Sequence, residues 1–248
     1  MRAACPVRVV LCQDCNALPG SPNKLGFTAP CPPFPLLSPL ATERVLFVVT
    51  AVPPMTVKLA VSLLQVATKQ LVAAQLVTMT PQHANDAQTH WRSVLAQSTE
   101  EDRFWDWEQF LRRHLAKPGA EGYALECCDR TQGMILLATR GYRSWVEPQR
   151  RVVYVEALAT APWNRSQLQA PQYRLVGGTL MEFARYRSAS LGYGGLVGLH
   201  SFPNAERFYT QLGLLNCGAD PDYDNLIYFE WYRPRPPRED EWDDTETN

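Results

Sequence analysis

The alternation of hydrophobic and polar positions between residues 71 and 231 predicts a mixed α/β domain. Short apolar runs bounded by turn residues are typical of strands, and they occur at 71–79, 123–128, 133–139, 152–160, 196–200 and 226–231. Apolar residues three or four positions apart are typical of amphipathic helices, and this spacing occurs at 81–97, 102–115, 176–191 and 203–212. The order predicts a mixed central sheet of about six or seven strands flanked by helices, with a parallel segment where helices intervene.

Two terminal segments have a composition that does not predict a packed core. Residues 1–54 hold ten of the twenty prolines and only two acids, so we expect a Pro-rich extension of low order that is dispensable for function. Residues 233–248 begin with arginines and prolines and then carry six acids, which is typical of a solvated tail. The functional domain is therefore expected at residues 55–232.

Charge and hydropathy narrow the class of protein. The 24 Lys and Arg residues and 25 Asp and Glu residues give a net charge of -1, whereas nucleic-acid binders usually carry a basic excess or stripe. Hydrophobic residues make up 46% of the chain, which is ordinary for a globular core. The longest apolar stretch, 56–79, is interrupted by Lys58, Lys69 and several glutamines. We therefore expect a protein that binds neither nucleic acid nor membrane.

The seven cysteines do not predict a disulfide framework. Their number is odd, and Cys127 and Cys128 are adjacent on an expected strand. Cys12 and Cys15 form a single C-x-x-C pair, but the spacing to the other cysteines is irregular and Pro-rich, unlike that of a four-ligand zinc site. We expect reduced thiols, a cytoplasmic location and no bound metal.

Three segments carry candidate chemistry. The strand at 152–160 places one carboxylate, Glu156, inside an apolar run, and such a group must be paired or exposed in a cleft because its burial is costly. The turn at 172–181 carries two adjacent glycines at the start of a helix, where free backbone N–H groups and the helix dipole favour a pyrophosphate. The helix at 204–213 contains the pattern A-x-x-x-Y-x-x-x-G, with Tyr209 as its tyrosine.

In this order, the three segments resemble the GCN5-related N-acetyltransferase (GNAT) superfamily of acyl-CoA-dependent transferases. The resemblance covers roughly residues 71–232 and implies an acyl-CoA N-acyltransferase-like fold. It also implies an enzyme that binds acetyl-CoA as co-substrate and moves the acetyl group directly to an amine, without a covalent enzyme intermediate. The acceptor would be a small-molecule or peptide amine, which no motif identifies. The sequence leaves the oligomeric state open.

The pyrophosphate turn of the superfamily reads Q/R-x-x-G-x-G/A. Gln172, Leu175 and Gly177 match this pattern best, with leucine in place of the first glycine. A register that starts at Arg174 would place Glu182 on the apolar face of the following helix. We therefore prefer the first register.

The resemblance also implies which residues contact acyl-CoA. The strand would pair with the pantetheine arm, and the turn would bind the pyrophosphate. Many members carry an asparagine three residues before the alanine of the last motif; that position is Phe202 here, and the asparagine is displaced to Asn204. The expected contacts are Leu158, Ala159, Thr160, Gln172, Val176, Gly177, Gly178, Thr179 and Asn204.

Two proton transfers follow from the resemblance. Glu156 would take the proton of the acceptor amine, and Tyr209 would protonate the leaving CoA thiolate, which a phenol with a pKa of about 10 can do. Phe208, beside Tyr209, is expected to turn into the core. The alternatives are an ion pair of Glu156 with Arg143 or Arg151, and a packing role for Tyr209.

Other candidates are weaker. Trp107 would face the acceptor or the core, and Trp163 would line the acceptor mouth, contact CoA phosphates or pack against its loop. His200 ends a strand and is expected to be structural, because the chain has no G-x-S-x-G nucleophile elbow for a Ser–His hydrolase. The period of two predicts that one face of the strand carries Tyr154, Glu156, Leu158 and Thr160.

The sequence is also compatible with a second function, without catalysis. The same fold can serve as a non-catalytic acyl-CoA-binding or protein-interaction domain, because fold does not determine activity. Leu175 in the expected pyrophosphate turn favours this alternative. Binding of CoA without turnover of any amine would distinguish it from the transferase.

Overall fold

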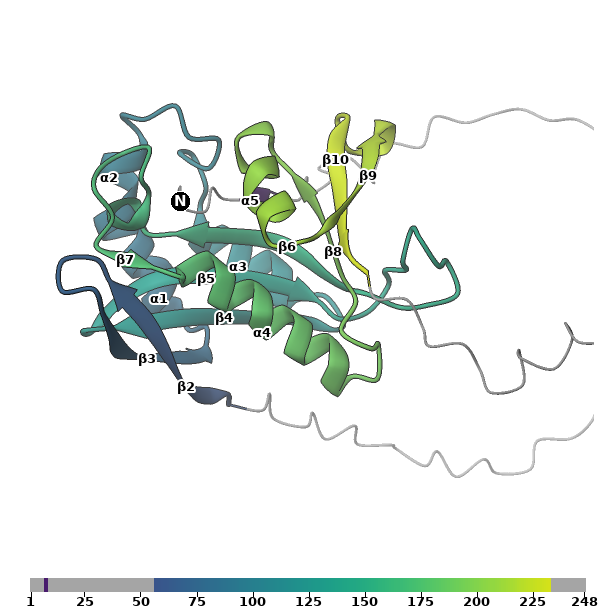
Figure 1. Cartoon of the computed structure of the whole chain (residues 1–248), viewed down its shortest axis with the longest axis horizontal. Coiled ribbons are helices and arrows are strands. Elements are labelled where there is room, and N and C mark those ends of the chain that lie inside the picture. The colour runs from purple at the N-terminus through teal and green to yellow at the C-terminus, as the bar shows by residue number, and fades with distance from the viewer. Residues whose placement is uncertain (1–6, 9–55, 233–248) are drawn as a thin grey trace, which may run out of the picture. The chain divides into compact units, whose positions relative to one another are not determined.

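A computed structural model of the chain describes residues 7–8 and 56–232. The expectations for the acidic tail, for Cys12 and Cys15, and for most of the Pro-rich extension concern residues outside this range. Within it, the chain forms one mixed sheet with helices on both faces (Figure 1). The predicted fold class, an α/β sheet flanked by helices, is confirmed.

Among the described residues, the sheet has ten strands rather than the predicted six or seven. Their path is β7-β2-β3-β4-β5-β6-β8-β10-β9, and β1 pairs with β6. All pairs are antiparallel except β6 with β8. The strands are β1 (Val7–Arg8), β2 (Lys58–Gln65), β3 (Gln70–Thr78), β4 (Ala120–Cys127), β5 (Arg130–Ala138), β6 (Val153–Thr160), β7 (Tyr173–Arg174), β8 (Val197–Ser201), β9 (Leu215–Asp220) and β10 (Leu226–Trp231).

The strands that the sequence analysis missed have weak local signals. β1 and β7 have two residues each, and β9 contains Asn216, Gly218 and Asp220, which are uncommon in strands. β2 lies near the sheet edge, and several of its apolar side chains are exposed. These strands form because they pair with a neighbour, not because their own pattern demands it.

The helices follow the predicted pattern with one shifted boundary. The second predicted helix begins at residue 107 instead of 102, because the Asp106 carboxylate accepts a hydrogen bond from the Gln109 N–H (2.9 Å) and caps the helix there. The first predicted helix contains a π-helical turn at Ala87–Trp91. The α-helices are α1 (Pro81–Asp86), α2 (Arg92–Leu95), α3 (Trp107–Leu115), α4 (Val176–Ser190) and α5 (Glu206–Gln211).

Two apolar cores lie on opposite faces of the sheet. On one face, α4 buries Leu180, Met181 and Ala184 against side chains of β4, β5, β6 and β8. On the other face, α1 to α3 bury an aromatic-rich core that includes Trp91 and Trp107. Figure 1 shows α4 crossing in front of the sheet and α1 and α3 behind it. The central strands are therefore covered on both sides, as their continuous apolar runs require.

A β-bulge in β6 reverses its side-chain alternation. Leu136 of β5 pairs with Ala157 and Leu137 with Val155, so Glu156 is the extra residue. Val155 and Leu158 therefore both point into the α4 core, while Ala157 lies in the opposite core. The expected single face of Tyr154, Glu156, Leu158 and Thr160 is wrong, because a period of two does not survive an inserted residue.

The parallel pair β6 and β8 is short and then diverges. Only Val153 with Val197 and Tyr154 with Gly198 are paired between them. Beyond Tyr154, the edge of β6 is contacted by β1, which pairs with Ala157 and Leu158 and also contacts β8. The backbone between Val155 and Thr160 therefore lies outside the β6–β8 pairing and is partly covered by β1.

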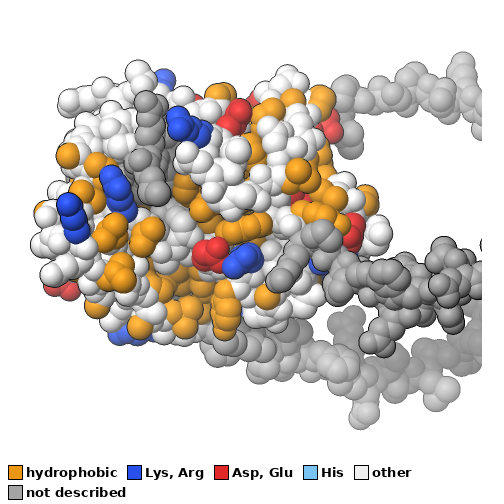
Figure 2. All heavy atoms as spheres, viewed as in Figure 1, with side chains coloured by type: hydrophobic (Ala, Val, Ile, Leu, Met, Phe, Trp, Pro, Cys, Tyr) orange, Lys and Arg blue, Asp and Glu red, His pale blue; other side chains and the backbone are white. Residues whose placement is uncertain are grey.

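The described residues were also compared with two further sequence expectations, on basic surface and on membrane-spanning helices. On the face in Figure 2, Lys and Arg side chains are scattered and form no continuous basic surface. Within residues 56–232, every helix is too short or too polar to span a bilayer.

Candidate active site

A cavity of about 520 Å³ opens where the end of β6, the start of α4 and one face of α5 meet. Four of the predicted acyl-CoA contacts line it: Thr160, Val176, Gly177 and Gly178. In the first turn of a helix, the backbone N–H groups have no intrahelical acceptor, so the positive end of the α4 dipole faces this cavity. The walls are otherwise mostly apolar: Leu64, Asn164, Pro171, Tyr173, Arg174, Leu175, Phe208, Gln211 and Leu212 complete the lining.

Leu175 adopts the backbone conformation that glycine favours. Its φ is 75° and its ψ is -3°, a left-handed conformation immediately before α4, and its side chain is 54% exposed. Glycine adopts this conformation with the least strain, and Leu175 stands at the position of the first glycine of the Q/R-x-x-G-x-G/A pattern. The geometry thus agrees with the register that starts at Gln172.

The remaining predicted contacts do not line the cavity. Leu158 and Ala159 are fully buried in the two cores. Gln172 is exposed and uses its backbone, with its N–H donating to the Trp163 carbonyl and its carbonyl accepting from the Val66 N–H (2.9 Å each). Thr179 and Asn204 also lie outside the lining set.

The sequence analysis missed several residues of the cavity wall. Arg174 is the exposed cation there, next to the first turn of α4. Tyr173 is held by Asn164, whose side-chain oxygen accepts from the Tyr173 N–H (3.0 Å). Both Tyr173 and Arg174 occupy variable positions of the turn pattern, so the motif alone could not select them.

Glu156 points to α3 and is engaged there. Its carboxylate lies 2.8 Å from His114 Nδ1 and 3.4 Å from Lys117 Nζ, and only 6% of the residue is exposed. The other ring nitrogen of His114 faces the Leu137 carbonyl (2.9 Å). Both ring nitrogens of His114 therefore face oxygen atoms that can accept hydrogen bonds. The alternative expectation, an ion pair of Glu156 with Arg143 or Arg151, is wrong in its partners: Glu156 contacts His114 and Lys117 instead.

The surroundings of Glu156 weaken it as a base. Burial by itself would raise the pKa of this carboxyl. The hydrogen bond and charge of His114, together with Lys117, outweigh burial and hold the pKa below its ordinary value. The carboxylate therefore binds a proton less readily than an exposed glutamate does.

Tyr209 and Phe208 are placed opposite to expectation. Tyr209 is fully buried in the α4 core, between the rings of Phe208 (4.9 Å) and Phe229 (5.8 Å). Phe208 is only partly buried and lines the cavity. The prediction that Phe208 turns into the core is wrong, because α5 presents that face to the cavity.

The two candidate tryptophans pack within the fold. Trp107 is buried and makes edge contacts with Trp105 (5.6 Å) and Phe110 (6.0 Å). Trp163 Nε1–H donates to the Gln132 side chain (2.9 Å), and its ring lies under the Arg130 guanidinium (4.6 Å). The packing alternative accounts for both.

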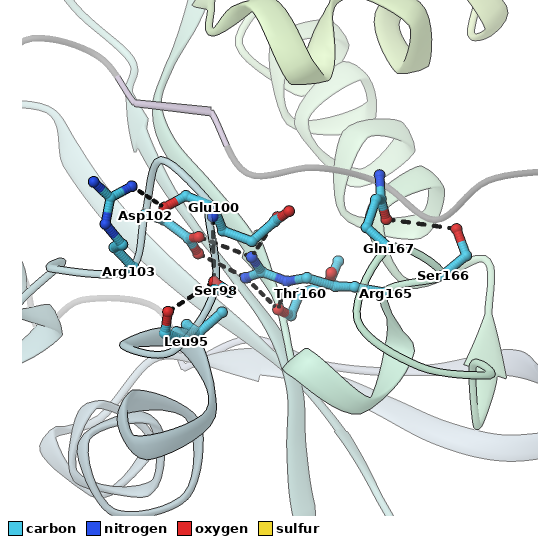
Figure 3. A network of polar contacts seen from close by, with 9 residues as sticks. All are labelled: Leu95, Ser98, Glu100, Asp102, Arg103, Thr160, Arg165, Ser166 and Gln167. Atoms are coloured by element: carbon cyan, nitrogen blue, oxygen red, sulfur yellow. Dashed lines mark hydrogen bonds and ion pairs between the residues drawn. The ribbon is translucent and has the colours of Figure 1, made fainter.

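A buried arginine fixes the end of β6 beside the cavity (Figure 3). Arg165 is fully buried, and its Nε and Nη2 both donate to the Thr160 carbonyl (2.9 and 2.7 Å). Its guanidinium also binds Asp102 (2.6 and 2.8 Å) and Glu100 (3.0 Å). Burial would lower the pKa of Arg165, but the two carboxylates outweigh it and raise the pKa. The residue joins the segment before α3 to the cavity wall.

Comparison with known proteins gives a fold likeness at low sequence identity. No family model matches the chain, and no curated protein matches it. Among solved structures, it is similar to a putative GNAT-family acetyltransferase from Desulfovibrio desulfuricans, at 13% identity, with 63% of this chain and 97% of that chain covered and a TM-score of 0.46.

Two further similar structures contain a CoA ligand. One is the aminoglycoside acetyltransferase AAC(6')-Iy with a CoA bisubstrate analogue, at 14% identity, 66% and 99% coverage and a TM-score of 0.44. The other is a putative streptothricin acetyltransferase from Bacillus anthracis with acetyl-CoA, at 18% identity, 50% and 68% coverage and a TM-score of 0.38. At these values, the likeness concerns the fold.

Proposed function

We propose that the chain is an N-acetyltransferase that binds acetyl-CoA and moves its acetyl group directly to an amine. The observation that carries the proposal is the cavity at the first turn of α4, which adjoins the end of β6. An anionic pyrophosphate suits the α4 end, where backbone N–H groups and Arg174 lie. The apolar wall with Phe208 and Leu212 suits the rest of a long, flexible ligand.

The reacting end of the ligand is proposed to reach the gap between β6 and β8. The β6 edge from Val155 to Thr160 lies outside the pairing with β8, and β1 pairs with it at Ala157 and Leu158. An extended arm is proposed to use the backbone hydrogen-bonding groups of this edge that β1 leaves open or gives up. Proximity of amine and thioester would supply much of the acceleration. Tyr209, which neighbours Phe208 of the cavity wall, is proposed to protonate the thiolate.

The second candidate is a non-catalytic acyl-CoA-binding domain. Two observations favour it: Leu175 replaces a glycine at the mouth of the cavity, and β1 pairs with the β6 edge that a pantetheine arm would use. Both would weaken binding of the co-substrate. Neither removes the cavity.

Calorimetric titration of the full chain with acetyl-CoA tests the binding step. Gly177→Val should abolish measurable binding, because a branched side chain would project from the first turn of α4, where the pyrophosphate is proposed to lie. Ala189→Val is the matched control, since it adds a similar branched side chain at an exposed position near the other end of α4. Unchanged acetyl-CoA affinity in a folded Gly177→Val protein would remove this cavity as the site.

Acetylation of a panel of amines then separates the two candidates. Turnover of at least one amine supports the transferase. Binding of acetyl-CoA without turnover of any amine favours the non-catalytic domain.

A further inference from the structure

A second cavity, of about 600 Å³, lies at the opposite end of α4 from the candidate active site. It is formed by the end of α4, the start of β4 and the loop that joins β5 to β6. The charged side chains of its lining are four arginines and one glutamate: Arg140, Arg143, Arg151, Arg187 and Glu121. A concave surface with an excess of three positive charges attracts anions and raises their local concentration.

The glutamate of this cavity is already neutralised by one of the arginines. Arg187 donates to both Glu121 oxygens, from Nε (2.8 Å) and from Nη2 (2.7 Å). The Tyr123 hydroxyl donates to the same carboxylate (2.7 Å). The positive charge that remains therefore belongs to the other three arginines, all of which are exposed.

These three arginines, Arg140, Arg143 and Arg151, lie on one loop and form no ion pair within the described residues. Arg143 and Arg151 face each other in an isolated antiparallel β-bridge. The Arg143 side chain donates only to neutral carbonyls of its own loop, those of Pro148 (3.4 Å) and Gln149 (3.3 Å). Like charges directly opposite on paired strands are destabilising, so a bound anion would relieve a repulsion that the loop otherwise keeps.

The acidic side chains next to the loop are engaged elsewhere. Glu147 accepts a hydrogen bond from the Tyr232 hydroxyl (2.7 Å). The Glu230 carboxylate accepts from the Trp145 N–H (2.8 Å) and from the Ser144 hydroxyl. These contacts attach the loop to β10 and to the residue after it. The backbone that carries the arginines is therefore held in place before a ligand arrives, which lowers the entropic cost of binding.

The end of α4 offers little opposition to an anion. The last carbonyls of a helix carry partial negative charge. Those of Arg187, Ser188 and Ala189 accept hydrogen bonds from the N–H groups of residues 191–193, at 2.9–3.1 Å. Because these carbonyls are satisfied within the turn, the arginine side chains dominate the charge of the cavity.

Three free guanidiniums suit an anion with several charges. Each guanidinium presents a planar fork of N–H donors that matches the oxygens of a phosphate. A phosphate monoester carries a charge of about -1.5 to -2 at pH 7 and three acceptor oxygens, so several forks can bind it at once. The volume of the cavity is in the range that small molecules occupy. We infer that this cavity is a binding site for a phosphate-bearing small molecule.

This site is separate from the candidate active site. Gly177 lines the first cavity and Arg187 the second, and they are ten residues apart on one helix, which corresponds to roughly 15 Å. The two cavities share no lining residue. The inference therefore does not rest on the proposed function and holds whether or not the chain binds acetyl-CoA.

Calorimetric titration of the full chain with inorganic pyrophosphate tests the site. Arg140→Gln and Arg151→Gln should each weaken binding by about tenfold or more, the effect of losing a charge-assisted hydrogen bond. Arg113→Gln is the matched control, since Arg113 is an exposed arginine of α3 on the other face of the sheet, and its loss should leave the affinity unchanged. Equal losses in all three variants would show attraction by net charge only and would overturn the site.

Arg174→Gln distinguishes the two cavities. It removes the exposed cation beside the first turn of α4, and the pyrophosphate binding that depends on Arg151 should persist in it. Loss of binding in Arg174→Gln, with none in Arg151→Gln, would place the anion in the first cavity and contradict this inference alone. No measurable binding to the wild type would also overturn it. A chain that binds pyrophosphate through Arg151 but does not bind acetyl-CoA contradicts the transferase alone.

Thermal unfolding separates a binding role of Arg151 from a structural one. Without the anion, Arg151→Gln should unfold at the wild-type temperature or above it, because the variant removes the repulsion across the β-bridge. Pyrophosphate should raise the unfolding temperature of the wild type and have little effect on the variant. Sodium acetate at the same ionic strength should not reproduce that rise. A variant that is less stable without the anion, or an equal rise with acetate, would overturn the site.

Discussion

At the scale of single residues, Leu175 is the clearest point of backbone strain in the candidate site. A left-handed conformation costs an L-residue roughly 1–2 kcal/mol, and Leu175 holds it with an exposed side chain. The surrounding turn must supply this free energy. The position therefore links the stability of the α4 start to the shape of the cavity.

Leu175→Gly is expected to stabilise the protein by up to about 1 kcal/mol, because relief of the left-handed strain exceeds the added freedom of glycine in the unfolded chain. Leu175→Val should destabilise it, since a β-branched residue is disfavoured there. Urea denaturation measures both. A destabilised glycine variant would mean that the leucine side chain contributes packing that outweighs its strain.

The buried contact between Glu156 and His114 is a second place where single residues contribute strongly to stability. Glu156→Gln should lower the free energy of unfolding at pH 7 by about 3–5 kcal/mol, because it removes the buried carboxylate that His114 and Lys117 both contact. The folded-state pKa of Glu156 is lowered, so its stabilisation is complete above the ordinary carboxyl pKa of about 4.3. It is lost as pH falls through the lower folded value.

Urea denaturation of wild type and variant at pH 7 and in acid measures this difference, which should shrink in acid. Glu126→Gln is the control: Glu126 also pairs with a histidine, His83 (2.8 Å), but its side chain is 41% exposed. That variant should lose less than about 1 kcal/mol. Equal losses in the two variants would contradict a buried ion pair at Glu156.

At the scale of elements, Arg165 joins three segments that are distant in the sequence. Glu100 and Asp102 lie before α3, and Thr160 ends β6. Because these bonds use all sides of one buried guanidinium, the segment from 98 to 106 and the cavity wall are coupled through a single side chain. The segment ends where Asp106 caps α3.

Arg165→Lys is expected to lower stability by about 3–5 kcal/mol, since a lysine cannot make the forked contacts to Asp102 and leaves carboxylates buried without their partner. Thermal unfolding with ligand-free protein measures the loss. Arg187→Lys is the matched control, because Arg187 also binds a carboxylate, Glu121 (2.7 Å), at a partly exposed site. A smaller loss at Arg165 than at Arg187 would show that burial does not strengthen the network.

At the scale of the whole molecule, the domain and the N-terminal extension meet in one described strand. β1 pairs with Ala157 and Leu158, on the edge that the proposed acyl-CoA arm would use. A chain that starts at Met55 lacks this strand and retains residues 56–232. The described cores are built almost entirely from that range.

We expect the chain from Met55 to fold and to bind acetyl-CoA more tightly than the full chain. Loss of β1 frees backbone groups, and one hydrogen bond contributes about 1 kcal/mol, or roughly fivefold in affinity. Calorimetry and thermal unfolding of both chains test this. Weaker binding would show that β1 supports the site, and an insoluble short chain would place the domain boundary before Met55.

The sequence by itself determined the elements whose pattern is local. The helix at 176–190 and the six predicted strands follow from periodicity, because such signals depend on neighbours a few residues away. The strands β1, β2, β7 and β9 were not predicted, since their formation depends on pairing partners. The cavity residues Thr160 and Gly177 were predicted because a motif places them.

Only the tertiary structure decided the partners of the buried polar groups. Glu156 meets His114 across 42 positions, and Tyr154 meets His200 across 46, and neither spacing has a local signature. A single bulge in β6 also changed which side chains share a face. Electrostatics and hydrogen bonding act over a few ångströms in space, whereas a sequence pattern reports only neighbours along the chain, so these contacts became visible only in the folded protein.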